Sequence, residues 1–405
     1  MRRVAEAGQR GEKVRSDCWV RVEPRSGGGL DLHVTTKVEA MYGDAVRATC
    51  RRTLDALGVE GAVVTVEDQG ALDFVIVARI ETAVNRAGLG NGRTFLPEPG
   101  PGFQARTTRE RFRRSRLYLP GNEPRFFLNA ALHGPDGIIL DLEDAVAPQE
   151  KDAARLLVRN TLRVVDFGPA ERMVRINQGE RGLEDVDAVV PQNVHMILIP
   201  KVESAEQVQA VDARAENARQ EAGLPQPCLL MPIIESPLGC FSALAIATAS
   251  PNIVALTIGL EDYTAHLGAE RTAEGRESVW ARQVVVNAAR AAGITPIDTI
   301  FSDVSDVEGL RRSALEAKSL GFEGKGCIHP RQVPVVNSAF APTPEEIEKA
   351  RRIVLAFEEA GRRGLGVVSL GSKMIDPPIV KRALRTVELA EALALLPKDW
   401  RTKEG

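Results

Sequence analysis

The 405-residue sequence has no surplus of charge of either sign: 52 Lys and Arg residues stand against 55 Asp and Glu residues, a formal net charge of −3. Because nucleic acids and anionic membranes favour a strongly basic surface, neither is expected as a partner. Aromatic residues make up only 4% of the chain, but hydrophobic residues make up 44%, which is typical of a globular protein. At roughly 150 residues per domain, the length predicts two or three domains.

The sequence also has few cysteines and no long apolar run. The cysteines are odd in number and form no Cys-x-x-Cys pair, which argues against a disulfide framework or a structural zinc site. No apolar run approaches the ~18 residues of a membrane span, and the charged N-terminal segment is not followed by the apolar core of a secretory signal. We therefore expect a soluble protein of the reducing cytoplasm.

Glycine and proline are unusually dense in one stretch, GLGNGRTFLPEPGPG after Ala87, which predicts a flexible linker over residues 89–112. Most of the arginines between Arg106 and Arg116 are expected on a solvated face of this linker. Residues 1–88 then form a small α+β domain. CWVRVEP, LDLHVTT and AVVTVED predict strands, with a turn at 25–29, and 38–57 predicts a helix. DFVIVARIETAVNRA is expected to begin as a strand and end as a helix.

Residues 113–398 have a different rhythm, in which short apolar strands alternate with amphipathic helical stretches. Eight strand signals follow one another: SRLYL, GIILDL, MVRIN, HMILIP, CLLMPIIE, IVALTIG, ITPIDTIF and GKGCIH. Eight such alternations over this length predict an α/β fold of the (β/α)8 TIM-barrel type.

Polar residues cluster where these strands end. In such barrels the carboxyl ends of the strands build the active site, so the clustering predicts an enzyme. The residues are Asp141, Glu143, Asp144, Arg175, Asn177, Lys201, Glu235, Glu261, Asp262, Ser302, Asp303 and His329.

Glu235 and Asp262 follow consecutive strands and are the candidate metal ligands. No His or Cys lies beside them in the sequence, so the available donors are hard oxygen atoms. Two carboxylate ligands leave coordination positions open for water and substrate, which suits Mg²⁺. Arg175 could clamp a substrate carboxylate through two nitrogens. Each residue taken alone fits an ordinary ion pair equally well, so the prediction depends on their convergence.

The motifs RSRLYLPGNEPRF, ILDLEDAVAPQEK, IPKVES, IIESPLG, IGLEDYTAHLGAERTAEG and GKGCIHPRQ resemble, in this order, the citrate lyase beta-subunit family of metal-dependent lyases. The resemblance covers almost all of 113–398. It implies Mg²⁺ on Glu235 and Asp262, and a substrate site formed by Arg175, Glu235, Glu143 and Asp144. Related pyruvate-dependent aldolases carry Gly-Glu-His after the second strand. This chain has Leu-Glu-Asp there, which argues against that branch.

The N-terminal part resembles the citrate lyase gamma subunit, an acyl carrier with a phosphoribosyl-dephospho-coenzyme A arm on a serine; QGALD is the most specific segment. The family carries Glu-Ser-Ser-Asp at the attachment site, with the first serine modified, where this chain has Val-Arg-Ser-Asp. Arg15 therefore occupies the modified position, and its neighbour Ser16 is the expected attachment site. The alternative is an unmodified carrier fold that serves packing or assembly.

The two resemblances together imply retro-Claisen cleavage of a 3-hydroxyacyl thioester, first of all a citryl thioester giving oxaloacetate and an acetyl thioester. An acyl- or CoA-transferase subunit is a possible partner. The segment Met-Ile-Asp implies a homo-oligomer, expected to be a trimer, in which Asp376 acts as acid–base group in a neighbouring site. Asp376 also fits a plain helix cap. The rival functions are a malyl-CoA or citramalyl-CoA lyase and a non-catalytic assembly scaffold.

Overall fold

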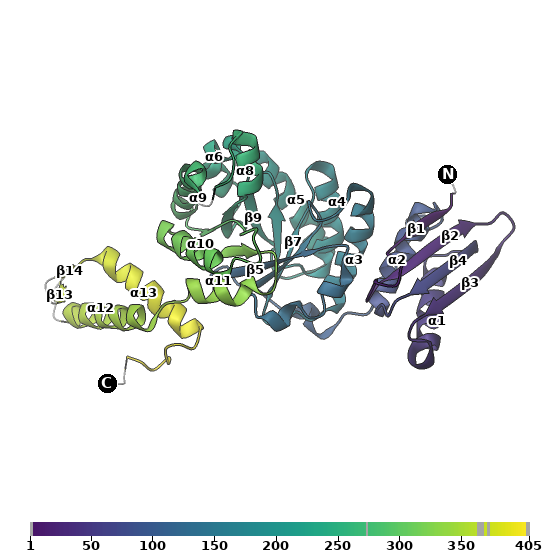
Figure 1. The fold of residues 1–405 in the computed structure, drawn as a ribbon, viewed down its shortest axis with the longest axis horizontal. Helices are drawn as coiled ribbons and strands as arrows, with labels where there is room; N and C mark the ends of the chain where they lie inside the picture. Colours follow the sequence, from purple (N-terminus) through teal and green to yellow (C-terminus); the bar gives the residue numbers. More distant parts are fainter. Residues whose placement is uncertain (1–2, 273, 363–367, 371–372, 402–405) are drawn as a thin grey trace.

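The computed structural model describes residues 3–272, 274–362, 368–370 and 373–401. Its parts follow one another along the long axis of the molecule (Figure 1). A small N-terminal domain lies at one end, a barrel lies in the middle, and a helical hairpin near the C-terminus lies at the other end. The active-site prediction concerns the barrel, and the two flanking parts matter through the way they are attached to it.

The N-terminal domain is a four-stranded sheet with two helices. Its elements are β1 (Ala5–Ala7), β2 (Cys18–Pro24), β3 (Gly29–Thr36), α1 (Glu39–Ala56), β4 (Gly61–Asp68) and α2 (Asp73–Arg86). The sheet order is β1-β2-β4-β3; β3 pairs in parallel with β4, and the other pairs are antiparallel. The predicted strands at 18–24, 30–36 and 62–68 and the helix predicted over 38–57 are confirmed to within one residue at each end. The expectation that DFVIVARIETAVNRA begins as a strand is wrong, because this segment is helical from its first residue.

The sequence pattern of helix α2 did not predict a helix at its start, because this helix is buried on both faces. Ile76 and Ile80 pack in the core of the N-terminal domain. Phe74, Val75 and Ala78 pack in the core of the barrel, where α2 lies against helix α3 (Lys151–Val164). A helix without a solvent-facing side has a continuous apolar run instead of a one-sided stripe, and such a run reads equally well as a buried strand.

The segment between the domain and the barrel is packed against the barrel, so the expectation of a flexible linker is wrong for its second half. It contains the short helix η1 (Pro101–Gln104). The buried guanidinium of Arg172 donates to the carbonyl oxygens of Gly102, Phe103 and Ala105 at 2.9, 3.3 and 3.4 Å. Backbone carbonyls held by a buried cation cannot move freely in solvent.

The barrel is built from eight parallel strands, as the sequence predicts. They are β5 (Ser115–Pro120), β6 (Gly137–Asp141), β7 (Glu171–Arg175), β8 (Met196–Ile199), β9 (Leu229–Ile234), β10 (Ala255–Ile258), β11 (Thr295–Ile297) and β12 (Lys325–Cys327). The sheet runs β11-β10-β9-β8-β7-β6-β5-β12, and a bridge between Asp298 and Lys325 closes the ring.

Helices surround this ring, with α3 followed by α4 (Gly179–Val189), α5 (Ala205–Glu221), α6 (Pro237–Phe241), α7 (Ala243–Ala247), α8 (Leu260–Leu267), α9 (Val279–Ala291), α10 (Val307–Leu320) and α11 (Gln332–Phe340). The largest core lies between strands and helices, and a second one fills the barrel interior around Ile139, Met173, Met196 and Met231. The interior also contains buried charged residues, to which we return below.

The C-terminal hairpin consists of α12 (Pro344–Arg362) and α13 (Pro377–Ala392), with β13 (Val368–Leu370) paired antiparallel to β14 (Lys373–Ile375) between them. It has a core of its own that includes Ile353, Val387 and Trp400, and it extends away from the barrel (Figure 1). Among the described residues, no helix has the length and apolar character needed to cross a membrane.

Candidate active site

A cavity of about 420 Å³ opens at the carboxyl ends of the barrel strands. Its walls come from residues at or just after the ends of seven of the eight strands, β5 to β7 and β9 to β12, among them Pro120, Asp141, Arg175, Glu235 and Thr299. Short loops after these strands therefore bring together side chains that are far apart in the sequence, as expected for the active face of this fold.

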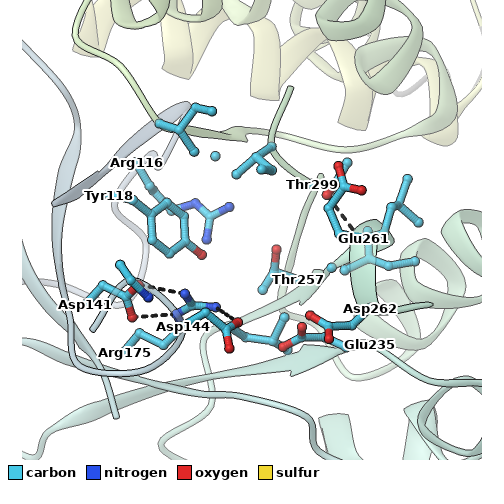
Figure 2. A pocket seen from close by; sticks show the side chains of 18 of the residues that line it. Arg116, Tyr118, Asp141, Asp144, Arg175, Glu235, Thr257, Glu261, Asp262 and Thr299 are labelled. Carbon is cyan, nitrogen blue, oxygen red and sulfur yellow. Dashed lines mark hydrogen bonds and ion pairs between the residues drawn. The ribbon is translucent and has the colours of Figure 1, made fainter. Parts of the chain in front are cut away.

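Glu235 and Asp262 lie close to each other at this cavity (Figure 2). Glu235 follows β9 and is 3% exposed, whereas the Asp262 side chain, in the first turn of α8, is 35% exposed. Burial raises the pKa of Glu235 to about 8, and the neighbouring Asp262 and Glu143 carboxylates add to the rise. Two such oxygen groups fit a hard divalent cation, which would relieve their repulsion.

The metal site would be open on the substrate side. Among the described residues, no group of three or more His, Cys, Asp or Glu side chains is arranged to hold a metal ion. Glu235 and Asp262 would therefore supply two ligands, and water and substrate would supply the others. This is the usual arrangement for Mg²⁺, which keeps several waters and takes substrate oxygens as ligands.

Arg175 is already held by carboxylates of the protein. Its Nε and Nη2 donate to the two oxygens of Asp141 at 2.7 Å each, and Nη1 lies 2.9 Å from Glu143 and 3.3 Å from Asp144. Burial alone would lower the pKa of Arg175, but hydrogen bonding to Asp141 raises it. The guanidinium also lies over the Tyr118 ring, at 5.4 Å from its centre. Asp141 thus takes Nε and Nη2, whereas Nη1 lies between the buried Glu143 and the exposed Asp144.

Lys201 connects the arginine cluster with the candidate metal ligands. Its ammonium lies 2.9 Å from Glu143, 3.3 Å from Asp144 and 3.7 Å from Asp262. Its backbone N–H donates to Glu235 at 3.2 Å, and its φ of 50° is in the left-handed region, which is strained for a residue with a side chain. The sequence places Lys201 after a barrel strand, but only the structure shows that it lies between the Arg175 cluster and Asp262.

The structure brings most of the sequence-predicted residues together. Asp144, Arg175, Glu235 and Asp262 line the cavity, and Glu143 reaches the same cluster through Arg175 and Lys201. Three other strand-end residues serve local structure instead. Asn177 donates to Asp185, Asp303 accepts from Ser305, and His329 accepts from the Arg331 N–H.

Sequence reasoning missed Arg116 and Tyr118, which also line the cavity. Arg116, at the end of the arginine run, is among the last few that were not expected on the solvated face, and it is 1% exposed, but no role was predicted for it. The signal was available: Arg116, Tyr118 and Pro120 alternate along β5, so one face of this strand presents all three to the barrel interior.

Asp376 and Ser16 lie outside this cavity. Asp376 caps α13 by accepting a hydrogen bond from the Ile379 N–H at 3.2 Å. Ser16 precedes β2 with a φ of 57°. The adjacent Asp17 is buried and held by Arg79, whose Nη2 also donates to the carbonyl of Asn122, just beyond the carboxyl end of β5. The carrier-like segment therefore lies beside the rim of its own barrel.

Comparisons with known proteins agree with both parts of the chain. Residues 114–330 match the HpcH/HpaI aldolase/citrate lyase family, and residues 6–87 match the acyl carrier family described as malonate decarboxylase delta subunit. The chain is 40% identical to the citrate lyase subunit beta of Leuconostoc mesenteroides over 72% of this chain and 97% of that protein. It is 34% identical to human mitochondrial citramalyl-CoA lyase over 69% of this chain and 86% of that protein.

Among solved structures, the CitE protein of Mycobacterium tuberculosis in complex with magnesium, acetoacetate and coenzyme A matches with a TM-score of 0.57 and 31% identity. The match covers 70% of this chain and 99% of that one. These similarities confirm the resemblance read from the barrel motifs and the carrier-like character of the N-terminal domain. The chain therefore belongs to the HpcH/HpaI aldolase/citrate lyase family of carbon–carbon lyases.

Proposed function

We propose that the protein is a Mg²⁺-dependent lyase that cleaves a 3-hydroxyacyl thioester by a retro-Claisen reaction, with a citryl thioester as the first candidate. The observation that carries this proposal is the pair Glu235 and Asp262, an oxygen-only ligand set at the mouth of a cavity that Arg175 also lines. Proteins similar to this chain are named for citrate and citramalyl-CoA cleavage, and one of them was solved with magnesium and coenzyme A.

The proposed reaction breaks the bond between the carbinol carbon and the carbon next to the thioester carbonyl. The hydroxyl proton leaves, its electron pair forms the keto group, and the electrons of the broken bond form a thioester enolate that takes up a proton at carbon. Mg²⁺ bound by Glu235 and Asp262 would acidify the hydroxyl. Arg175 would orient the substrate carboxylate through Nη1, while Glu143 and Asp144 hold the guanidinium and the Lys201 ammonium in place.

The thioester enolate also needs an acid–base residue. We propose that Asp376 of a neighbouring chain supplies it, within a homotrimer. The hairpin extends away from its own barrel (Figure 1), which is the geometry such an exchange needs. A cytoplasmic location and a transferase partner subunit belong to the same proposal.

The thioester is proposed to be carried by the N-terminal domain through an arm on Ser16. The contact between Arg79 and Asn122 supports this idea, because it holds the segment beside the barrel rim. Peptide mass spectrometry on protein from its native host tests it, with Ser16→Ala and the exposed turn residue Ser26→Ala as matched variants. A bare Ser16 peptide, with turnover of free coenzyme A thioesters unaffected by Ser16→Ala, would favour the malyl-CoA or citramalyl-CoA type of lyase.

Metal dependence tests the lyase itself. Glu235→Gln and Asp262→Asn should each lower kcat about 10²-fold or more, and EDTA should abolish activity reversibly, because both variants remove a ligand charge. Asp303→Asn is the matched control, since Asp303 also follows a barrel strand but hydrogen-bonds only to its own loop. Full activity in metal-free buffer contradicts the proposal. A wild type that binds no Mg²⁺ and cleaves no thioester would favour the assembly scaffold.

A further inference from the structure

The floor of the active-site cavity contains a buried arginine that the proposed reaction does not use. Arg116 is the second residue of β5, so its side chain rises from deeper in the barrel than the residues at the strand ends. It is 1% exposed and lines the cavity. Figure 2 shows its guanidinium beside the Tyr118 ring, directed into the cavity.

The hydrogen-bonding capacity of Arg116 is largely unused. A guanidinium has five N–H donors. Within the described residues, Nη1 contacts the thioether sulfur of Met231 at 3.1 Å and Nη2 contacts the carbonyl oxygen of Asp298 at 3.4 Å, while Nε has no hydrogen-bond partner. A thioether is a weak acceptor, and a buried unsatisfied donor costs roughly 1–3 kcal/mol. Because buried donors are nearly always hydrogen-bonded, a bound ligand is expected to supply the missing acceptor.

Other buried arginines of this protein have more acceptors. Arg172 is also without a carboxylate and its Nε has no hydrogen-bond partner, but its Nη1 and Nη2 donate to backbone carbonyls of the packed linker. Three more each hold a carboxylate through two nitrogen atoms, in the pairs Arg79–Asp17, Arg113–Glu171 and Arg159–Glu81. Arg116 differs from all of these because it faces a cavity.

The carboxylate beside Arg116 is already paired with other cations. The buried carboxylate of Asp298 receives Lys325 at 2.7 Å and Arg282 at 3.2 Å, and Arg282 also pairs with Glu316 at 3.3 Å. Arg116 itself reaches the backbone carbonyl oxygen of Asp298, at 3.4 Å. Burial lowers the pKa of the Arg116 guanidinium, as expected for a cation without a close counter-ion. An anion placed at the cavity floor would be strongly favoured there.

We propose that Arg116 binds the second carboxylate of the keto-acid half of the substrate and so selects thioesters that release a dicarboxylic keto acid. This inference rests on the proposed function, in which the first carboxylate and the hydroxyl lie near Glu235 and Asp262 at the rim. A citryl thioester has a carboxymethyl group on the carbinol carbon, and this group reaches down to Arg116. A citramalyl thioester has a methyl group there and a malyl thioester a hydrogen, so both leave Arg116 unpaired, which costs affinity.

Binding of the two product acids tests the inference without turnover. The affinities of oxaloacetate and pyruvate are measured by calorimetry with saturating Mg²⁺, for the wild type, Arg116→Met, Arg116→Lys and Met231→Leu. The wild type should prefer oxaloacetate by at least about 30-fold, because losing one partner of a buried charge pair has a cost of that size. Arg116→Met should abolish the preference and leave pyruvate binding unchanged. Arg116→Lys should keep part of it, since the charge remains without the two-pronged geometry.

Met231→Leu is the matched control, because it changes the contacting side chain, conserves volume and keeps the arginine. It should keep the oxaloacetate preference. If Arg116→Met fails to fold, the wild type and Arg116→Lys still decide: equal affinity of the wild type for both acids overturns the inference.

Cleavage assays separate this inference from the proposed reaction. A binding preference that Arg116→Met removes, in a protein that cleaves no thioester, keeps the role of Arg116 as a dicarboxylate binder and rejects the lyase. Equal kcat/KM for citryl and citramalyl thioesters, lowered equally by Arg116→Met, rejects the selectivity role and keeps the lyase.

Discussion

The N-terminal domain and the C-terminal hairpin flank the barrel at opposite ends, and they are attached to it by different physical means (Figure 1). The N-terminal domain shares helix α2 with the barrel core and is tied to it by the buried ion pair Glu81–Arg159. The hairpin has its own core. One of its contacts with the barrel is an ion pair between the half-exposed Arg385 of α13 and Glu323, which precedes β12. Burial fixes the first part to its own barrel, whereas surface ion pairs hold the second.

This difference assigns the two flanking parts different proposed tasks. A carrier-like domain that is fixed at the rim has to rely on a long prosthetic arm, because the domain itself cannot swing. A lid on an extended hairpin suits an oligomer, because it can reach a site that its own barrel does not offer.

Breaking the buried ion pair should uncouple the N-terminal domain. Both oxygens of Glu81 accept from Arg159 at 2.8 Å, and the two side chains are 0% and 6% exposed. Glu81→Ala leaves a buried cation without its partner, which typically costs about 3–5 kcal/mol. Urea unfolding measures this loss. Arg385→Ala is the matched control on the hairpin side, where an exposed pair is worth at most about 1 kcal/mol. Equal losses of unfolding free energy in the two variants would show that the N-terminal domain is held no more firmly than the hairpin.

The same contrast explains what the sequence could predict. The eight barrel strands, and Glu235, Asp262 and Arg175 at or after their carboxyl ends, follow from local patterns, because the carboxyl end of each strand in this fold faces the active side. The burial of α2, the packing of residues 100–105 and the inward position of Arg116 depend on contacts between distant segments. Local composition could not reveal them, because the cavity that Arg116 enters is formed by strands that are distant in the sequence.

Asp376→Asn tests the exchange of the hairpin between chains. Asparagine caps helices as well as aspartate does, so this variant keeps the cap seen at Ile379 and removes only the acid. If Asp376 is the acid–base group, kcat should fall at least ~10²-fold with little change in KM or stability. Asp376→Ala should add a stability loss of about 0.5–2 kcal/mol through the missing cap.

Mixed oligomers decide whose site Asp376 serves. Chains with Asp376→Asn and chains with Glu235→Gln are each expected to be inactive alone. In a mixture, some sites combine an intact Asp376 from one chain with an intact Glu235 from the next, so part of the activity should return. Mixtures that stay as inactive as the parents, although mass analysis shows mixed assembly, would contradict a cross-chain role.

Acid should weaken the N-terminal attachment through His195, the smallest of these effects. Its Nδ1 accepts from the Arg172 N–H at 3.2 Å, and its Nε2 contacts the linker carbonyl of Ala105 at 2.9 Å. Burial lowers the pKa of His195 to about 4, the Arg172 charge adds to the decrease, and Arg111 and Glu171 also face the ring with opposite effects. In the unfolded chain the pKa returns to about 6.5. Between these values only the unfolded state binds the proton, so stability is complete above pH 6.5 and falls as the pH drops toward 4. At pH 5 the loss is about 2 kcal/mol.

Urea unfolding of the wild type and of His195→Gln at pH 7 and pH 5 measures this loss, because glutamine stays neutral while the other titrating groups are common to both proteins. The wild type should lose about 2 kcal/mol more than the variant over this interval, and equal losses would show that His195 does not carry the acid sensitivity of the linker contact.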